Sequence, residues 1–135
     1  MAQKKLSSGV YADIIVSVTD LPPGAWSYSA DPGGILNSVV AVTIAAAVAG
    51  ARNSVMGVQI NSEALGAATE VAIRDGAGGA VLWRLKIGTG GFPNGLSVPF
   101  HSPVTGSTGN LLEFVTLTAS VTGAVYFNAQ GLRVI

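Results

Sequence analysis

The strongest constraint on the fold is a repeating pattern of strand-like segments and glycine-containing turns, which runs from about Asn53 to Arg133. Within these segments apolar and polar residues alternate, as in Thr69–Arg74, where Val71 and Ile73 share one side. Successive side chains of a β-strand point to opposite faces, so a period of two predicts half-buried strands. Turn signals recur roughly every 8–12 residues, which predicts an all-β antiparallel sandwich, jelly-roll-like, with about eight to nine strands.

The 135 residues correspond to one domain. Residues 1–9 form a polar N-terminal arm, and residues 10–135 are predicted to form a single β-sandwich domain. The expected early strands are Tyr11–Thr19, Trp26–Ser29, Leu36–Val48 and Val55–Ile60. The segment Leu36–Val48 is apolar on both faces, and its alanine run leaves a helix open. Its β-branched residues favour a strand that is buried on both sides.

Two hairpins are predicted in the second half of the chain. The first joins Thr69–Arg74 to Val81–Ile87 through a five-residue loop, which places Val71 opposite Trp83 in the core and Glu70 opposite Arg84. The second joins the strand that begins at Glu113 to the C-terminal strand through a three-residue loop, Val121 to Gly123. That loop places Leu117 opposite Phe127.

Charge is scarce in this sequence. Charged residues make up 10% of the chain, against roughly 25% in ordinary soluble domains. Net charge is zero, hydrophobic residues make up 49%, and mean hydropathy is +0.53. We therefore expect part of the outer surface to be buried against copies of the chain or against a larger partner. The alternative is a monomer whose surface is covered by small Ala, Gly, Ser and Thr side chains.

The composition argues against several classes of function. The chain has one histidine, no cysteine and seven acidic residues. This is little material for a nucleophile with its base, a carboxylate pair or a metal cage, so we expect no enzyme and no cofactor. Lys4 and Lys5 form the only adjacent basic pair, which argues against nucleic acid as a partner. The longest apolar run, Val39–Ala49, is shorter than the ~20 residues of a membrane helix, and no signal peptide is expected.

Five residues are candidates for contact with a partner. Lys4 and Lys5 lie on the predicted arm and could bind an acidic surface, with a solvated terminus as the alternative. Trp26, Tyr28 and Phe92 could form an aromatic platform for sugar, with packing in the core or an interface as the alternative.

Three other features are weaker candidates for a functional site. His101 has no second histidine or cysteine near it, so a structural or surface role is expected. Asp13, Asp20 and Asp31 could meet at one end of a sandwich and hold calcium, but they lack the spacing of a calcium loop. The glycine-rich segment Gly88–Gly95 lacks the Gly-Lys-Ser/Thr ending of a phosphate-binding loop, so a surface loop is expected.

Four stretches together carry a family resemblance, which covers roughly residues 50–135. They are Ala51–Ile60, Ala68–Gly76, Val81–Arg84 and Ala124–Gly131. In these stretches the chain resembles the small virion proteins of tailed bacteriophages, most of all their capsid decoration, or cement, proteins. The resemblance implies a jelly-roll-like fold, no cofactor, and a homotrimer seated on the major capsid protein at the outer surface of the virion. Synthesis and assembly would take place in the host cytoplasm.

Three competing functions remain open at this level. One is a trimeric tail-fibre or receptor-binding module that recognises sugar on the host surface. Another is a carbohydrate-binding module with calcium at Asp13 and Asp20, and the last is an enzyme of unrecognised type. Poverty of charge, sparse aromatic residues and the N-terminal arm favour the cement protein.

Overall fold

The computed structural model describes residues 4–5, 11–12, 24–30, 35–36, 41–118 and 122–135, and these residues contain strands and turns but no helix. Two short strands near the N-terminus pair with each other: β1 (Lys4–Lys5) and β2 (Tyr11–Ala12). The remaining strands are β3 (Ala25–Tyr28), β4 (Ile35–Leu36), β5 (Ala41–Ala45), β6 (Arg52–Ser62), β7 (Thr69–Asp75), β8 (Ala80–Ile87), β9 (Leu96–Thr105), β10 (Leu112–Thr116) and β11 (Ala124–Val134).

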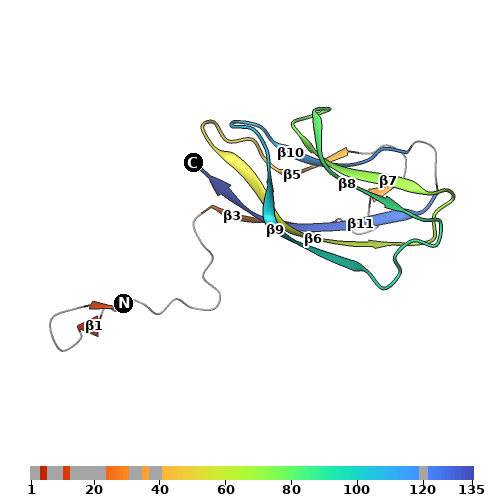
Figure 1. Cartoon of the computed structure of the whole chain (residues 1–135), viewed down its shortest axis with the longest axis horizontal. Coiled ribbons are helices and arrows are strands. Elements are labelled where there is room, and N and C mark those ends of the chain that lie inside the picture. Colours follow the sequence, from red (N-terminus) through yellow and green to blue (C-terminus); the bar gives the residue numbers. More distant parts are fainter. Residues whose placement is uncertain (1–3, 6–10, 13–23, 31–34, 37–40, 119–121) are drawn as a thin grey trace.

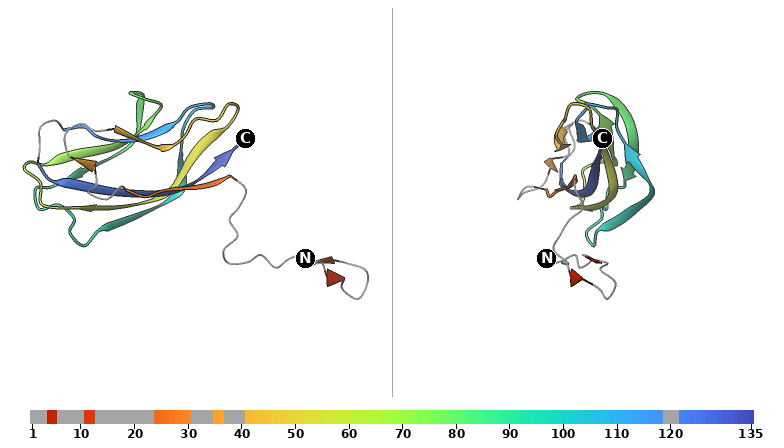
Figure 2. Two further views of the ribbon diagram at one scale, coloured as in Figure 1. Left: turned by 180° about the vertical axis from the view of Figure 1, so that it is seen from behind. Right: turned by 90° about the vertical axis from the view of Figure 1, so that its left-hand side faces the viewer.

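These strands form two antiparallel sheets that face each other (Figures 1 and 2). One sheet has the order β5-β10-β7-β8, and the other has the order β3-β11-β6-β9, with β4 also paired to β11. The pairing is nested: β7 pairs with β8, β6 with β9, β5 with β10, and β3 with β11. This is the order of a long antiparallel ribbon rolled into a jelly roll, so the predicted fold class is confirmed.

The β7–β8 hairpin forms, but its predicted register is wrong. Ile73 lies opposite Trp83 and Ala72 opposite Arg84, because the turn already pairs Asp75 with Ala80 and the register shifts by one more residue at a bulge next to Arg74. The observed pairing differs from the predicted one by two residues along this part of the ladder. A shift of two keeps each side chain on its predicted face, whereas a shift of one would invert the faces. Arg84 still reaches Glu70, at 3.5 Å and along the diagonal of the ladder.

The second predicted hairpin is wrong. The strands β10 and β11 belong to different sheets, and the connection between them crosses from one layer to the other. β10 lies between β5 and β7, and β11 lies between β3 and β6. The predicted core face of β10 is inverted as well: Leu112 and Phe114 line the core, whereas Val115, expected there, lies on the same side as Glu113. Phe127, expected beside Leu117, instead lies opposite Ile60 of β6.

Several other predictions are corrected in detail. The segment Leu36–Val48 is strand rather than helix over β5, but Ala41 and Thr43 are exposed, so β5 is not buried on both faces. Only Tyr11–Ala12 of the predicted strand Tyr11–Thr19 is described, and it pairs with β1 rather than with the sandwich. The predicted division into an arm and a domain at residue 10 stays a prediction.

The core lies between the two sheets and is filled by the inward residues of both. Its centre is a pair of fully buried rings, Phe114 of β10 and Phe127 of β11, whose centroids lie 3.7 Å apart with planes 10° from parallel. Trp83, predicted for the core, is half-buried at the open edge between the sheets. There its ring meets Phe100 of β9 edge to face, with centroids 5.7 Å apart and planes at 80°.

Gly131 of β11 offers a test of this packing. A Cβ atom at Gly131 would overlap the carbonyl oxygen of Ser54 and the ring of Trp26. Because the oxygen belongs to the backbone of a central strand, it cannot move aside easily. Gly131→Ala should lower the free energy of unfolding by about 1–3 kcal/mol, as overpacked cores do.

Urea denaturation measures this change, and Gly90→Ala is the matched control. Nothing lies within 4 Å of a Cβ atom at Gly90, so its effect should stay within about 0.5 kcal/mol. Equal effects of the two substitutions would show that Trp26 does not pack on Gly131.

Candidate functional site

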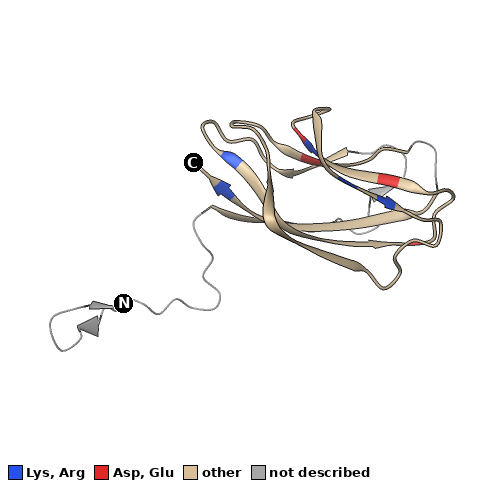
Figure 3. Ribbon diagram, viewed as in Figure 1, with Lys and Arg blue, Asp and Glu red and all other residues tan. Residues whose placement is uncertain are grey.

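The outer face of the four-stranded sheet carries most of the described charges (Figure 3). We call this the charged face; it comprises Glu70, Arg74, Arg84, Lys86 and Glu113. These residues alternate with the core residues of β7, β8 and β10. Glu113 is buried and its Oε2 accepts from Arg74 Nε at 2.7 Å and from the amide of Gly78 at 2.8 Å. The charges on this face therefore largely satisfy one another.

The outer face of the other sheet has no charged residue at its described central positions. Polar, uncharged side chains alternate there with core residues, and we call this the amide face; it comprises Ser27, Gln59, Asn61, Ser97, Tyr126, Asn128 and Gln130. Gln59 and Gln130 form a reciprocal pair in which each Nε2 donates to the other Oε1, at 2.9 and 2.8 Å. Asn128 Oδ1 accepts from the amide of Ala30 at 3.1 Å.

A pocket of about 330 Å³ lies on the amide face where β6 and β9 meet the turn before β9. Its polar lining comes from Gln59, Asn61, Asn94, Ser97 and Asn128. Gln59 lies opposite Asn128 on one side and opposite Ser97 on the other, so three strands contribute to the same spot. The lining residues carry no formal charge.

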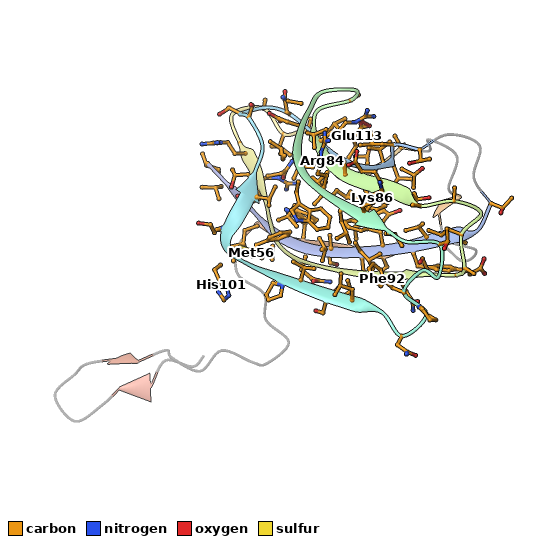
Figure 4. All side chains as sticks on the ribbon, turned by 45° about the vertical axis from the view of Figure 1, so that its right-hand side comes forward. Met56, Arg84, Lys86, Phe92, His101 and Glu113 are labelled. Carbon is orange, nitrogen blue, oxygen red and sulfur yellow. The ribbon has the colours of Figure 1, made fainter. Side chains whose placement is uncertain are left out.

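One end of the sandwich gathers the exposed large hydrophobic residues of the described chain, and we call it the apolar end. Its residues are Val48, Met56, Val134 and Ile135, together with Arg52 and Arg133. Val134 lies opposite Arg52, and the turn containing Val48 leads directly into β6. Met56 has no partner in the β6–β11 ladder, where the register shifts, and its side chain is 40% exposed (Figure 4). A bulge of this kind turns a side chain outward.

The two arginines of the apolar end form no ion pair with any described acid. Arg52 Nε donates to the carbonyl of Gly106 at 2.9 Å. Arg133 Nε is buried without a hydrogen-bond partner within the described residues. This end of the molecule therefore combines exposed apolar area with two guanidinium groups that form no ion pair with a described acid, although the charge of Arg52 acts on Asp75.

Asp75, at the end of β7, fixes the loop that follows β9. Its carboxylate accepts from the Ser107 amide at 2.9 Å, from the Ser107 hydroxyl at 2.6 Å, and from Asn110 Nδ2 at 3.1 Å. Burial acts to raise the pKa of Asp75, but the bonds from Ser107 and Asn110 and the charge of Arg52 together outweigh it. The pKa of Asp75 is therefore lowered from the ordinary 3.8.

A lowered pKa in the folded state means that ionised Asp75 stabilises the fold at neutral pH. This contribution is fully present above the ordinary pKa of 3.8 and is lost as the pH falls through the lower folded value. Asp75→Asn should reduce Tm at pH 7 and flatten the fall of Tm at acidic pH. Thermal unfolding followed across the acidic range measures both effects. The control Glu70→Gln leaves the Asp75 bonds intact and should keep the acidic fall, whereas an unchanged acidic fall in Asp75→Asn would contradict this role.

The aromatic candidates do not form one platform. Trp26, Tyr28 and Phe92 are half-buried and pack against the core. Trp26 of β3 pairs with Gly131 of β11, and Gly131 in turn lies opposite Val55 of β6. The Phe92 amide, in contrast, donates to Ser62 Oγ at 2.9 Å. Val55 and Ser62 lie seven residues apart on β6, roughly 23 Å along a strand. The structure thus separates the two ends of the predicted platform.

The remaining candidates supply no assembled site. Lys4 and Lys5 form β1, but their side chains lie outside the described residues, as do Asp13, Asp20 and Asp31. His101 is exposed on β9 (Figure 4). Among the described residues, no group of three His, Cys, Asp or Glu side chains could hold a metal ion.

Two further sequence features can be placed. The described residues contain no helix long and apolar enough to span a membrane. The predicted loop Gly88–Gly95 is anchored by backbone bonds from Leu65 to Thr89 and from Ser62 to Phe92, so it is a fixed turn over the end of β6.

The sequence reasoning missed the amide face. A signal for it is present, because Gln59 and Asn61 are spaced by two, as are Asn128 and Gln130. Each pair alternates with apolar residues and so must share the outward side of its strand. The pairing of β6 with β11 then brings the two pairs side by side, which no local pattern indicates.

Comparison with known proteins gives few matches. No family model and no curated protein matches the chain. Among solved structures, the Tobacco streak virus coat protein aligns with 13% identity and a TM-score of 0.41, covering 84% of this chain and 89% of that chain. VP2 of infectious bursal disease virus, in a subviral particle, aligns with 14% identity and a TM-score of 0.27, covering 99% of this chain and 37% of that chain. Because both the sequence identities and the TM-scores are low, the jelly-roll fold is assigned from the strand order alone.

Proposed function

We propose that this chain is a structural virion protein: a decoration, or cement, protein that binds the major capsid protein as a homotrimer on the outer surface of a phage head. The observation that carries the proposal is the apolar end. Exposed apolar area that is gathered in one place marks a protein–protein contact. Arginine is enriched at such contacts because its guanidinium binds carbonyl and carboxylate groups and its stem packs on apolar surface.

The rest of the described surface fits this assignment. Four of the five residues of the charged face are paired with one another, and the exposed Glu70–Arg84 pair contributes little to binding. The amide face is polar and neutral. The apolar end therefore offers the best surface for burial, in agreement with the low charge of the whole chain.

The proposed role is mechanical, with no enzymatic step and no cofactor. A trimer that bridges neighbouring capsid subunits has its full contacts only on the assembled shell. By mass action, such binding favours the assembled state over the dissociated one. A closed trimer also keeps the association finite, because its contacts do not propagate into fibres.

The test combines light scattering of the purified protein with sedimentation in the presence of undecorated phage heads. A stable trimer that sediments with the heads is the expected result. Met56→Glu and Val134→Glu, which place a charge in the apolar end, should each reduce trimer formation or head binding. Thr89→Glu in the exposed turn after β8 is the matched control and should behave like the unmodified chain. A monomer that ignores the heads would overturn the proposal.

A second candidate function is favoured by the pocket on the amide face. In a receptor-binding module of a tail fibre, the same sandwich would recognise sugar at the host surface. A trimer that ignores heads but binds host cells would favour this function over the cement protein.

A further inference from the structure

We infer that the pocket on the amide face is a binding site for a neutral, hydroxyl-rich ligand, namely one sugar ring of a glycan. The inference does not depend on capsid attachment. The pocket volume, about 330 Å³, lies at the small end of ligand sites, which hold roughly 300–1,000 Å³. A site of this size admits one ring and leaves a longer chain free to continue into solvent.

The chemistry of the lining matches hydroxyl groups. A sugar hydroxyl both donates and accepts hydrogen bonds, and a side-chain amide offers two donor hydrogens beside an acceptor oxygen. Four amides and one serine hydroxyl surround the pocket, from Gln59, Asn61, Asn94, Asn128 and Ser97. Because the lining holds no cation and no carboxylate, it offers no charge to select a phosphate, a carboxylic acid or an amine.

Part of this lining is held in place before any ligand arrives. The Ala30 amide fixes Asn128 through Oδ1, which leaves the Asn128 Nδ2 group as a donor. Gln130 holds Gln59 by two bonds, and these leave one donor hydrogen and one acceptor lone pair of Gln59 unused. Fixing polar groups in advance lowers the entropy that binding must overcome.

The other lining groups are available to a ligand. Asn61, Asn94 and Ser97 are exposed, and their side chains have no hydrogen bond within the described residues. Ile60 and Leu96 also border the pocket, but they belong to the inward rows of their strands, so hydrogen bonds rather than apolar packing select the ligand. The pocket thus combines fixed donors with free donors and acceptors.

Position separates this pocket from the apolar end. Asn61 lies nine residues along β6 from Arg52, which is roughly 30 Å at the rise of an extended strand. Met56, the nearest residue of the apolar end, lies three residues from Gln59, roughly 10 Å along the same strand. A capsid-bound molecule could therefore still present the pocket to solvent. Failure of head binding and failure of sugar binding are consequently separate results.

The experiment is an NMR titration of the isotope-labelled full chain, which resolves the side-chain amide signals. The probes are N-acetylglucosamine and mannose as neutral free sugars, short neutral oligosaccharides of the same units, and sialic acid as the anionic comparison. Saturable shifts at the side-chain amides of Asn61, Asn94 and Asn128 are expected with a neutral probe. A response to oligosaccharides alone would identify an internal ring of a glycan as the ligand, and a response to free sugars would identify a single ring.

Two substitutions test the assignment of the pocket. Asn61→Ala and Asn94→Ala should each weaken binding by about three- to tenfold, the loss expected for one neutral hydrogen bond. Asn94 lies in a turn, so its replacement should leave the fold intact, and Tm verifies this. Ser27→Ala, on the same face but outside the pocket, should leave binding unchanged. Absence of binding to every neutral probe, shifts confined to other parts of the chain, or a preference for sialic acid would each overturn the inference.

Discussion

Phe114→Ala should lower the free energy of unfolding by about 3–5 kcal/mol, the largest loss expected for one side chain of this fold. The Phe114 ring is fully buried and stacks on Phe127 across the two sheets, with centroids 3.7 Å apart. Removing it deletes the transfer energy of the ring and leaves a cavity between layers that cannot collapse freely. The variant also loses the stacking energy between Phe114 and Phe127, about 0.5–1.5 kcal/mol.

Urea denaturation of a double-mutant cycle measures that stacking energy separately. Phe114→Ala, Phe127→Ala and the double variant should show coupling, because each single variant already removes the contact. Phe100→Ala is the matched control, since Phe100 is half-buried at the edge and meets Trp83 only edge to face. A loss for Phe114→Ala no greater than for Phe100→Ala would contradict the assignment of β10 and β11 to opposite sheets.

Glu113→Ala should destabilise the chain by about 3 kcal/mol, the lower end of the range for breaking a buried ion pair. The side chain of Glu113 is only 7% exposed and that of Arg74 is 20% exposed, and the two groups approach to 2.6 Å. The substitution leaves the Arg74 guanidinium without its acceptor in a partly buried place. It also removes the acceptor of the Gly78 amide in the β7–β8 turn.

Glu70→Ala provides the matched control on the same face. The Glu70–Arg84 pair spans 3.5 Å, and its side chains are 33% and 57% exposed, so its loss should cost about 0–1 kcal/mol. Thermal and urea unfolding of both variants at neutral pH measure the difference. Similar losses of unfolding free energy for the two substitutions would show that Glu113 is solvated and that the charged face holds no buried ion pair.

Local alternation predicted the class of fold because it reports a property of single strands. Val71 and Ile73 point inward whether β7 pairs with β8 in one register or in another that differs by two residues. The sequence pattern therefore identified strands and turns, and it identified the inward faces of β7, β8 and β11 but not that of β10. It also indicated a jelly roll from the number and spacing of the strands.

That pattern could not predict which strands pair with one another. Alternation in Glu113–Val121 predicted a hairpin with Val115 and Leu117 inward, whereas Leu112 and Phe114 line the core. The jelly roll separates the two strands, and it thereby creates the Phe114–Phe127 stack and the Arg74–Glu113 pair. Both contacts join strands that no local signal relates.

The candidate site follows the same division. The sequence by itself determined that the chain has little charge, little catalytic material, and outward polar residues on its strands, because these are properties of composition and period. Only the tertiary structure decided that Gln59 and Asn61 of β6 meet Asn128 of β11 and Ser97 of β9 around one pocket, and that Trp26 and Phe92 lie apart. The physical reason is that strand order is fixed by packing between distant segments, whereas the pattern within each strand fixes only which way its side chains point.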